Sequence, residues 1–415
     1  MNKIFFSQKL NDLYHLVFIL ACFSIVWSCK KSSETDPQLN FAKYVAVGNS
    51  LTAGVSNNGL YNESIKNSYP NLIAQQMKSV GGGSFLQALF AMGQENGTGY
   101  LKFKGYNGFI PNIVQESSNT ALISLVPPRL NKYVGENQNL GMPFMKMADI
   151  DDKNIRNFNL FFDRILADNA QSISYLQLVE ASNPTFFTCW LGNNDVLSFA
   201  SSGGRIPITD KTIFKTNLVK LLELLTKNGA KGVVANIGDI TAAPAITLLT
   251  NLRPLFVSTK FYIETKKGVR EGTSKDYLLL PNNLSTVDIG ILTAKGTKLS
   301  EPWADNEVFD SDEVAIAQKA ILELNEIISA EANIRKLAIV DAYSFLNKLK
   351  IGISDNGEFV DSGYISGGIF SLDGAHLTAK GNAYTANEYI KAINTYYKSN
   401  IPLLDTKLYK GVVPE

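Results

Sequence analysis

His376 is the residue best suited to moving protons near neutral pH, because histidine titrates near ~6.5. The chain contains two histidines, and His15 lies within residues 1–28, which have the composition of a removable signal segment. His376 follows Asp373 by three positions. An aspartate can orient an imidazole that takes a proton from a nucleophile and returns it to a leaving group. A lone Asp-x-x-His pair is more often structural than catalytic, so the other polar motifs must decide between the two interpretations.

Two further polar motifs each follow an apolar run that we predict to be a strand. Ser50 stands in a Gly-Asn-Ser-Leu motif after residues 44–47, and Asn194 in a Gly-Asn-Asn-Asp motif after residues 186–191. Open α/β folds bind ligands at the carboxyl edge of the sheet. At that edge the Ser50 hydroxyl would be a nucleophile, and the Asn194 amide would donate to an oxyanion. The competing interpretations are that Ser50 caps a helix and that Asn194 belongs to an ordinary turn.

Short apolar runs alternate with amphipathic segments along the chain, which favours a parallel α/β sheet. The expected strands are residues 44–47, 186–191, 232–237 and 337–340. Helices are expected from Phe214 to a closing Gly229, from a capping box at Asp310 and Glu313, and after the N-cap Thr378. Residues 79–135 and 345–370 are rich in glycine and polar residues. They are expected to be loop-rich insertions that overhang the site.

The N-terminal segment predicts secretion and lipid anchoring. Lys3 and Lys9 precede an apolar run at residues 16–27, which is too short to span a bilayer and suits a signal segment. Cys29 follows this run as in the lipobox of bacterial lipoproteins, although an ordinary signal with an incidental cysteine is the alternative. We therefore expect a signal peptide over residues 1–28, lipidation of Cys29 and a flexible tether over residues 29–40. The protein would then be attached to the membrane through Cys29 in the bacterial cell envelope, with the outer membrane as the expected site.

The composition excludes several other classes of function. Without residues 1–28 the chain carries 37 basic and 37 acidic residues, so no excess of positive charge is available to bind nucleic acid. If Cys29 is acylated, Cys189 has no partner for a disulfide and is expected to be a buried small side chain. One histidine and one free thiol without paired spacing predict no metal site. We expect no cofactor either.

Together these motifs resemble the SGNH hydrolases, also called the GDSL lipase/acylhydrolase family. Gly48-Asn49-Ser50-Leu51 is similar to the family's first block, with Asn49 in place of the usual aspartate. Gly192-Asn193-Asn194-Asp195 is similar to the third block, and Asp373-Gly374-Ala375-His376 to the fifth. The candidate for the second block is Asn139-Leu140-Gly141-Met142-Pro143, expected to be a short loop after a strand, with Gly108 as the alternative. The resemblance covers about residues 41–398.

This resemblance implies a flavodoxin-like three-layer α/β/α sandwich with a mostly parallel sheet. Residues 41–415 would form that hydrolase domain, with the insertion at about 79–135. It also implies a serine esterase in which Ser50 attacks an acyl carbonyl and His376, held by Asp373, is the base. The oxyanion would accept hydrogen bonds from Ser50, Gly141 and Asn194.

The substrate implied by the resemblance is an ester of a small molecule, a glycan or a lipid. Asn49 cannot supply a negative charge, but its amide can hold the loop by hydrogen bonds. The alternative from another functional class is a non-catalytic envelope lipoprotein that uses the same fold to bind a ligand. A purely binding protein would have no need of a serine, an asparagine, an aspartate and a histidine in this order.

Overall fold

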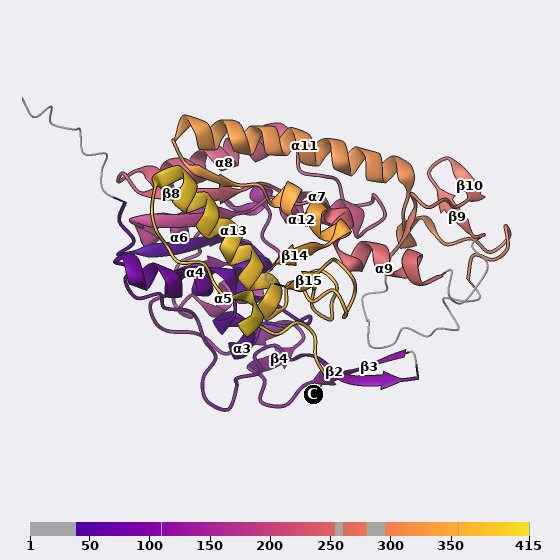
Figure 1. Ribbon diagram of the computed structural model, residues 1–415, viewed down its shortest axis with the longest axis horizontal. Coiled ribbons are helices and arrows are strands. Elements are labelled where there is room, and N and C mark those ends of the chain that lie inside the picture. Colours follow the sequence, from indigo (N-terminus) through magenta and orange to yellow (C-terminus); the bar gives the residue numbers. More distant parts are fainter. Residues whose placement is uncertain (1–38, 109, 254–259, 280–294, 356, 415) are drawn as a thin grey trace, which may run out of the picture. The chain divides into compact units, whose positions relative to one another are not determined.

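Five strands of the described residues form one parallel sheet in the computed structural model (Figure 1). The middle strands are almost completely buried, as expected for apolar runs covered on both faces. In spatial order the strands are β6 (Asn139–Gly141), β1 (Tyr44–Gly48), β7 (Phe186–Trp190), β8 (Lys231–Ala235) and β13 (Ala338–Val340).

The strand order creates a switch point between β1 and β7. From β1 the chain first moves outward to the edge strand β6, and it then returns to β7 on the other side of β1. A reversal of this kind leaves a crevice at the carboxyl ends of the two strands, where α/β folds bind ligands. Ser50 follows β1 and Asn194 follows β7, so both motifs lie at the switch point. The flavodoxin-like order confirms the predicted fold class.

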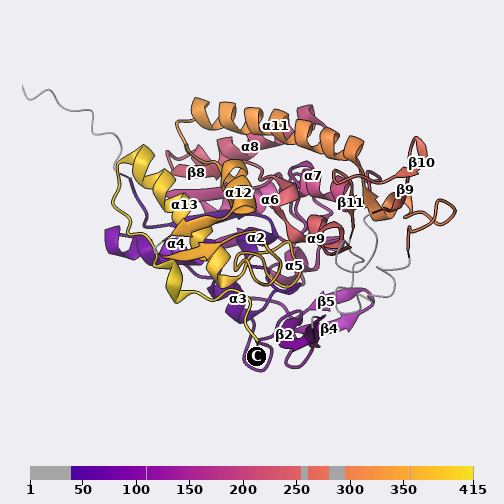
Figure 2. The ribbon, with the colours of Figure 1, turned by 45° about the vertical axis from the view of Figure 1, so that its right-hand side comes forward.

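Helices cover both faces of this sheet (Figures 1 and 2). On one face α6, α8 and α11 pack on alternate strand residues such as Val45 and Phe187. On the other face α4 and α13 pack together, and the rings of Tyr69 and Tyr389 stack with their centroids 4.9 Å apart. The helices are α2 (Ser50–Ala53), α3 (Asn62–Lys66), α4 (Tyr69–Met77), α5 (Leu160–Arg164), α6 (Tyr175–Ser182), α7 (Asn193–Ala200), α8 (Lys211–Thr226), α9 (Pro244–Leu252), α11 (Ser311–Ile334), α12 (Ala342–Ile351) and α13 (Ala379–Tyr397).

The structure describes residues 39–108, 110–253, 260–279, 295–355 and 357–414. Residues Asn40–Glu415 form one compact unit. The expected signal segment at residues 1–28, Cys29 and nearly all of the expected tether lie outside the described residues. Within the described ranges, no helix has both the length and the apolar character needed to cross a membrane.

Several local predictions can be compared with the structure. The capping box of Asp310 and Glu313 and the N-cap Thr378 are confirmed, and Cys189 is buried as predicted. The stretch 345–370 differs from the prediction, because α12 extends to Ile351 and a hairpin follows it. The strands outside the central sheet are β2 (Tyr100–Asn107), β3 (Ile110–Glu116), β4 (Leu122–Leu125), β5 (Pro128–Leu130), β9 (Tyr262–Thr265), β10 (Gly268–Glu271), β11 (Tyr277–Leu278), β12 (Val308–Phe309), β14 (Ile353–Asp355) and β15 (Glu358–Val360).

The predicted insertion at 79–135 contains two hairpins, β2–β3 and β4–β5, as well as loops. The first hairpin follows a pattern of period two, because Leu101 and Phe103 are buried while Lys104 is exposed. This alternation is present in the sequence and would have predicted a strand.

Candidate active site

Ser50 is the first residue of the short helix α2, directly beyond β1. The N-cap of this helix is Asn49, whose Oδ1 accepts a hydrogen bond from the N–H of Leu51 at 3.0 Å. The interpretation of Ser50 as the helix cap is therefore wrong. Neither the hydroxyl nor the N–H of Ser50 has a hydrogen-bond partner among the described residues, so both are available to a substrate.

Asp373 and His376 form a close pair. Nδ1 of His376 lies 3.0 Å from Oδ2 of Asp373, and the imidazole side chain is 23% exposed. Oδ1 of Asp373 also accepts the N–H groups of Ala375 at 2.8 Å and of His376 at 2.7 Å. Burial opposes ionisation of this carboxyl. The charge of His376 and these N–H donors outweigh burial and hold the pKa of Asp373 well below its ordinary range. Asp373 is therefore a carboxylate at any working pH.

The Asp373 loop is bound to the chain segment that follows α2. The N–H of Asn58 donates to Oδ2 of Asp373 at 2.6 Å. Beside it, the N–H of Asn57 donates to Oγ of Ser371 at 2.9 Å, and Oδ1 of Asn57 accepts the N–H of Leu372 at 3.0 Å. Both asparagines have a positive φ, of 51° and 60°, a conformation that asparagine tolerates better than most residues. These bonds join segments that are about 315 residues apart.

No hydrogen bond joins Ser50 and His376 in this structure. The second ring nitrogen of His376, Nε2, has no hydrogen-bond partner among the described residues, and the same is true of Oγ of Ser50. In enzymes without substrate, the contact between nucleophile and base is often longer than a hydrogen bond and shortens in the complex. The structure thus brings Asp373 and His376 into contact and ties their loop to the segment after α2. It does not show the contact between serine and histidine.

Asn194 lies in the first turn of α7 and is half-buried. Its Nδ2 donates to the carbonyl of Met145 at 3.0 Å, and an amide nitrogen has a second N–H. The neighbouring Asp195 is fully buried and accepts the N–H groups of Met147 at 2.8 Å and Ala148 at 3.2 Å. Burial raises the pKa of Asp195 to about 6. Two consecutive residues of α7 therefore fix the chain between residues 145 and 148.

Gly141 allows the close approach of α2 to β6, which its sequence context did not indicate. It is the last residue of β6 and pairs with Gly48 of β1, whereas the sequence predicted a loop here. A Cβ at this position would lie 2.1 Å from the backbone nitrogen of Ala53, so only glycine leaves room for α2. The N–H of Gly141 donates to Oδ1 of Asn139 at 3.0 Å and is already engaged. The alternative, Gly108, lies at the end of β2 near the tip of a hairpin.

The turn after β6 holds a residue that the sequence did not indicate. Phe144 has a φ of 66°, which is the left-handed region that favours glycine and costs a phenylalanine roughly 1–3 kcal/mol. Its N–H has no acceptor among the described residues, and its side chain is 73% exposed. The flanking carbonyls are both held, that of Pro143 by Nδ2 of Asn159 at 2.7 Å and that of Met145 by Asn194. Nothing in the sequence of this segment predicts that a phenylalanine adopts the left-handed backbone conformation.

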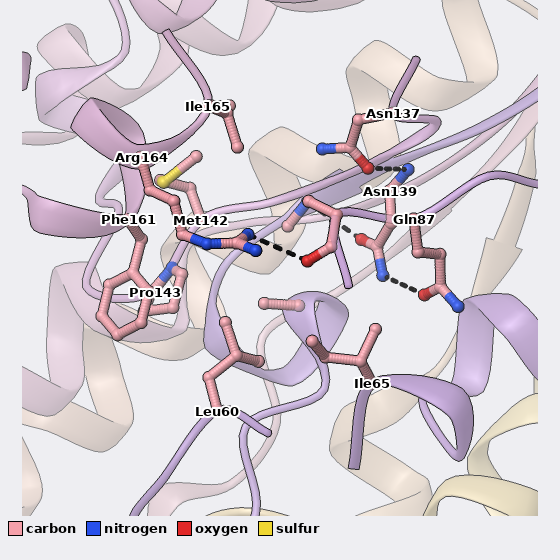
Figure 3. A pocket seen from close by; sticks show the side chains of 13 residues that line it. Leu60, Ile65, Gln87, Asn137, Asn139, Met142, Pro143, Phe161, Arg164 and Ile165 are labelled. Atoms are coloured by element: carbon pink, nitrogen blue, oxygen red, sulfur yellow. Dashed lines mark hydrogen bonds between the residues drawn. The ribbon is translucent and has the colours of Figure 1, made fainter. Parts of the chain in front are cut away.

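A small pocket lies behind this turn (Figure 3). It has a volume of about 40 Å³, which is room for about three water molecules. Phe161 and Pro143 lie side by side on its wall, and the guanidinium of Arg164 extends toward its centre (Figure 3). The lining includes Ala53 of α2 and Gly141 of β6. The pocket therefore adjoins the helix of Ser50, but it is too small for a large substrate group.

Two aspartates at other strand ends have local roles. Asp239 accepts the N–H of Thr241 and pairs with Lys350 at 2.6 Å. Asp341 is the N-cap of α12 and accepts the N–H of Ser344 at 3.0 Å. Among the described residues there is no group of three or more side chains that could hold a metal ion.

Comparison with known proteins gives a family match and a similarity to solved structures. The family model described as GDSL-like lipase/acylhydrolase matches residues 44–389, from β1 into α13. The search of curated proteins found no match to this chain. Among solved structures, the crystal structure of an acetyl xylan esterase is similar over 84% of this chain and 98% of its own, at 15% identity and a TM-score of 0.34. The family match includes Ser50, Asn194, Asp373 and His376.

Proposed function

This chain belongs to the GDSL-like lipase/acylhydrolase family of hydrolases that act on ester bonds, and on that premise we propose that it cleaves carboxylic esters through an acyl-enzyme intermediate on Ser50. One observation carries the proposal. The segment that follows the helix of Ser50 is hydrogen-bonded to the loop of an Asp373–His376 pair, although the two segments are far apart in the sequence. A fold without catalytic function would not require such a pair to be bound to the segment that follows an unpartnered serine.

The residues would act in the following order. Oγ of Ser50 attacks the ester carbonyl while Nε2 of His376 takes its proton, and Asp373 holds the imidazole by Nδ1 and stabilises its positive form. The histidine then returns the proton to the leaving alcohol, and the serine carries the acyl group. A water molecule then gives a proton to the same histidine and attacks the acyl carbon. The bond between this carbon and Oγ of Ser50 breaks, and the histidine returns the proton to Oγ, which releases the carboxylic acid and restores the serine.

The oxyanion would be stabilised by hydrogen-bond donors at the switch point. Two of them are the N–H of Ser50 and the second N–H of the Asn194 amide. We assign the third to the backbone N–H of Phe144 in place of Gly141, because the N–H of Gly141 is occupied by Asn139. The left-handed φ of Phe144 supports this assignment, since a turn of this shape directs an N–H group away from the sheet.

A fluorophosphonate probe tests the proposed function directly. The wild-type protein should be labelled once, and mass spectrometry should find the label on the peptide that contains Ser50. Ser50→Ala should remain unlabelled, while Ser56→Ala, a change at a buried serine six residues on, should be labelled normally. The protein should also hydrolyse p-nitrophenyl acetate. If the wild type is not labelled, or if Ser50→Ala is labelled equally, the protein is not a serine esterase and a binding role becomes the better hypothesis.

We also propose that the protein is a lipoprotein of the bacterial cell envelope, attached to the outer membrane through Cys29. The support is in the sequence alone, in the basic residues Lys3 and Lys9, the apolar run 16–27 and the cysteine after it. Cells grown with a palmitate analogue should incorporate it into the wild-type protein. Cys29→Ser should incorporate none, whereas Cys189→Ser should be labelled like the wild type. Equal incorporation into Cys29→Ser would reject lipidation at this residue.

A further inference from the structure

The turn at Pro143–Met145 places an exposed aromatic ring beside the proposed oxyanion site. Phe144 is 73% exposed, so its ring gains little from packing within the fold. An aromatic neighbour is Phe161, with ring centroids 6.3 Å apart and the planes tilted by 42°. The two rings belong to different elements, because Phe161 lies in α5. They form a short aromatic surface beside the carboxyl ends of β1 and β6.

The conformation of this turn is imposed from both sides. Asn159, which is buried and caps α5, donates to the carbonyl before Phe144, and Asn194 donates to the carbonyl after it. Any residue at position 144 must therefore adopt the left-handed backbone. Glycine would do so without strain, and it would present the same N–H to an oxyanion. The backbone alone thus gives no reason for a phenylalanine, and the fold gives the exposed ring little packing.

The pocket behind the turn does not accept a substrate ring. Its volume of about 40 Å³ holds a few water molecules, whereas a six-membered ring needs more room. Arg164, Phe161 and Pro143 occupy its wall. A ring carried by a substrate would not fit this pocket, and outside it the exposed ring of Phe144 is an aromatic surface next to the switch point.

We propose that Phe144 is a stacking platform for a six-membered ring carried by the ester substrate, a pyranose or an aryl group. This proposal rests on the proposed esterase function. Both kinds of ring present a flat face with apolar C–H or π character, which packs on an aromatic ring over a large area. A linear alkyl group offers no such face and loses more conformational freedom when it is ordered. Phe144 would therefore determine specificity through its ring, in addition to the role of its backbone N–H.

The test is a ratio of specificity constants. Wild type and variants would be compared on p-nitrophenyl acetate, on an acetylated methyl xylopyranoside and on butyl acetate as the linear reference. In Phe144→Ala the ratio of kcat/KM for each ring ester to that for butyl acetate should fall roughly fivefold. Phe144→Trp should keep this ratio near the wild-type value, whereas Phe144→Leu should lower it. A purely structural or oxyanion role would lower all three values together and leave the ratio unchanged. The two ring substrates separate a sugar preference from an aryl preference.

The second measurement is the melting temperature, which reports the strain of the left-handed backbone at Phe144. Phe144→Gly should raise the melting temperature by about 1–3 °C while lowering the ring-to-linear ratio as Phe144→Ala does. Phe158→Ala is the matched control, because Phe158 is 80% exposed and lies outside the turn. It should change neither quantity. If Phe144→Ala leaves the ratio at the wild-type value while hydrolysis persists, the platform is rejected and the esterase function stands. If no ester is hydrolysed in a Ser50-dependent way, the proposed function itself fails.

Discussion

Replacing His376 by alanine is expected to lower kcat/KM for p-nitrophenyl acetate by at least ~10⁴-fold, because the serine then has no base. The effect should be this large because the only other histidine, His15, lies in the segment that we expect to be removed. No second imidazole can substitute. The side chain of His376 bonds to Asp373 alone among the described residues, so its loss should leave the fold intact. Circular dichroism and urea unfolding check this requirement.

Two additions make the His376→Ala experiment specific. Free imidazole, which is small enough to enter the vacated position, should restore a measurable part of the activity to His376→Ala. It should restore none to Ser50→Ala, where the nucleophile is absent. A variant that retains activity within tenfold of the wild type would show that this histidine is not the base.

Asp373→Asn is expected to lower kcat by ~10⁴-fold while also destabilising the protein. In the wild type both carboxylate oxygens face N–H groups, those of Ala375, His376 and Asn58. An asparagine has one NH₂ group, and in either orientation this group must face a donor. Each buried donor left unpaired costs roughly 1–3 kcal/mol, so the unfolding free energy should fall by at least this amount. The loss of negative charge also removes the partner that stabilises the protonated imidazole.

The contribution of Asp373 to the stability of the folded state depends on pH in a defined direction. The pKa of Asp373 is held below its unfolded value of ~3.9, so its ionisation stabilises the folded state at pH values above ~4. This contribution is lost only as the pH falls further, through the folded pKa. The part of the stability difference between wild type and Asp373→Asn that comes from this ionisation should therefore be constant from pH 8 to pH 5 and shrink below ~4. Because the pKa of Asp373 lies below that value, its protonation should not contribute to a loss of activity at pH values above ~4.

Asp341→Asn is the matched control for Asp373→Asn. Asp341 follows β13 and caps α12, and its pKa, like that of Asp373, is lowered by hydrogen bonds, here to Ser344 and Asn236, despite partial burial. It has no histidine partner. Asp341→Asn should lower stability modestly and leave kcat within a few-fold of the wild type. Equal losses of kcat in the two variants would mean that Asp373 acts only through the stability of the fold.

Many of the strands and helices could be predicted from the sequence, because the patterns that indicate them are local. The strands at residues 44–48 and 186–190 are continuous apolar runs, and both were predicted to within one residue. The helices that begin after Asp310 and Thr378 carry capping side chains that act within one turn. The strand β6 could not be predicted in the same way. It has three residues, one of them a glycine, and its pairing with β1 comes from the sheet.

The second block of the site shows why a motif can indicate the wrong atom. Gly141 was a reasonable candidate for an oxyanion donor, since glycine permits a close approach of the backbone. In the structure that approach is made by α2, and the N–H is bound by Asn139. The free N–H and the left-handed backbone occur three residues later, at Phe144. The φ angle of Phe144 could not be predicted from its residue type, because it depends on hydrogen bonds from two asparagines elsewhere in the chain.

The sequence by itself determined which groups this protein has for chemistry and in what order they occur along the chain. Ser50, Asn194, Asp373 and His376 each follow from their own short motif, and the family match covers all four. Only the tertiary structure decided that the segment after Ser50 is bound to Asp373, because hydrogen bonds between residues 315 positions apart depend on the whole sheet between them. It also decided that the turn beside the site presents an exposed phenylalanine. The local sequence of a segment therefore determines which chemical groups it carries, and long-range packing determines which other segments these groups contact.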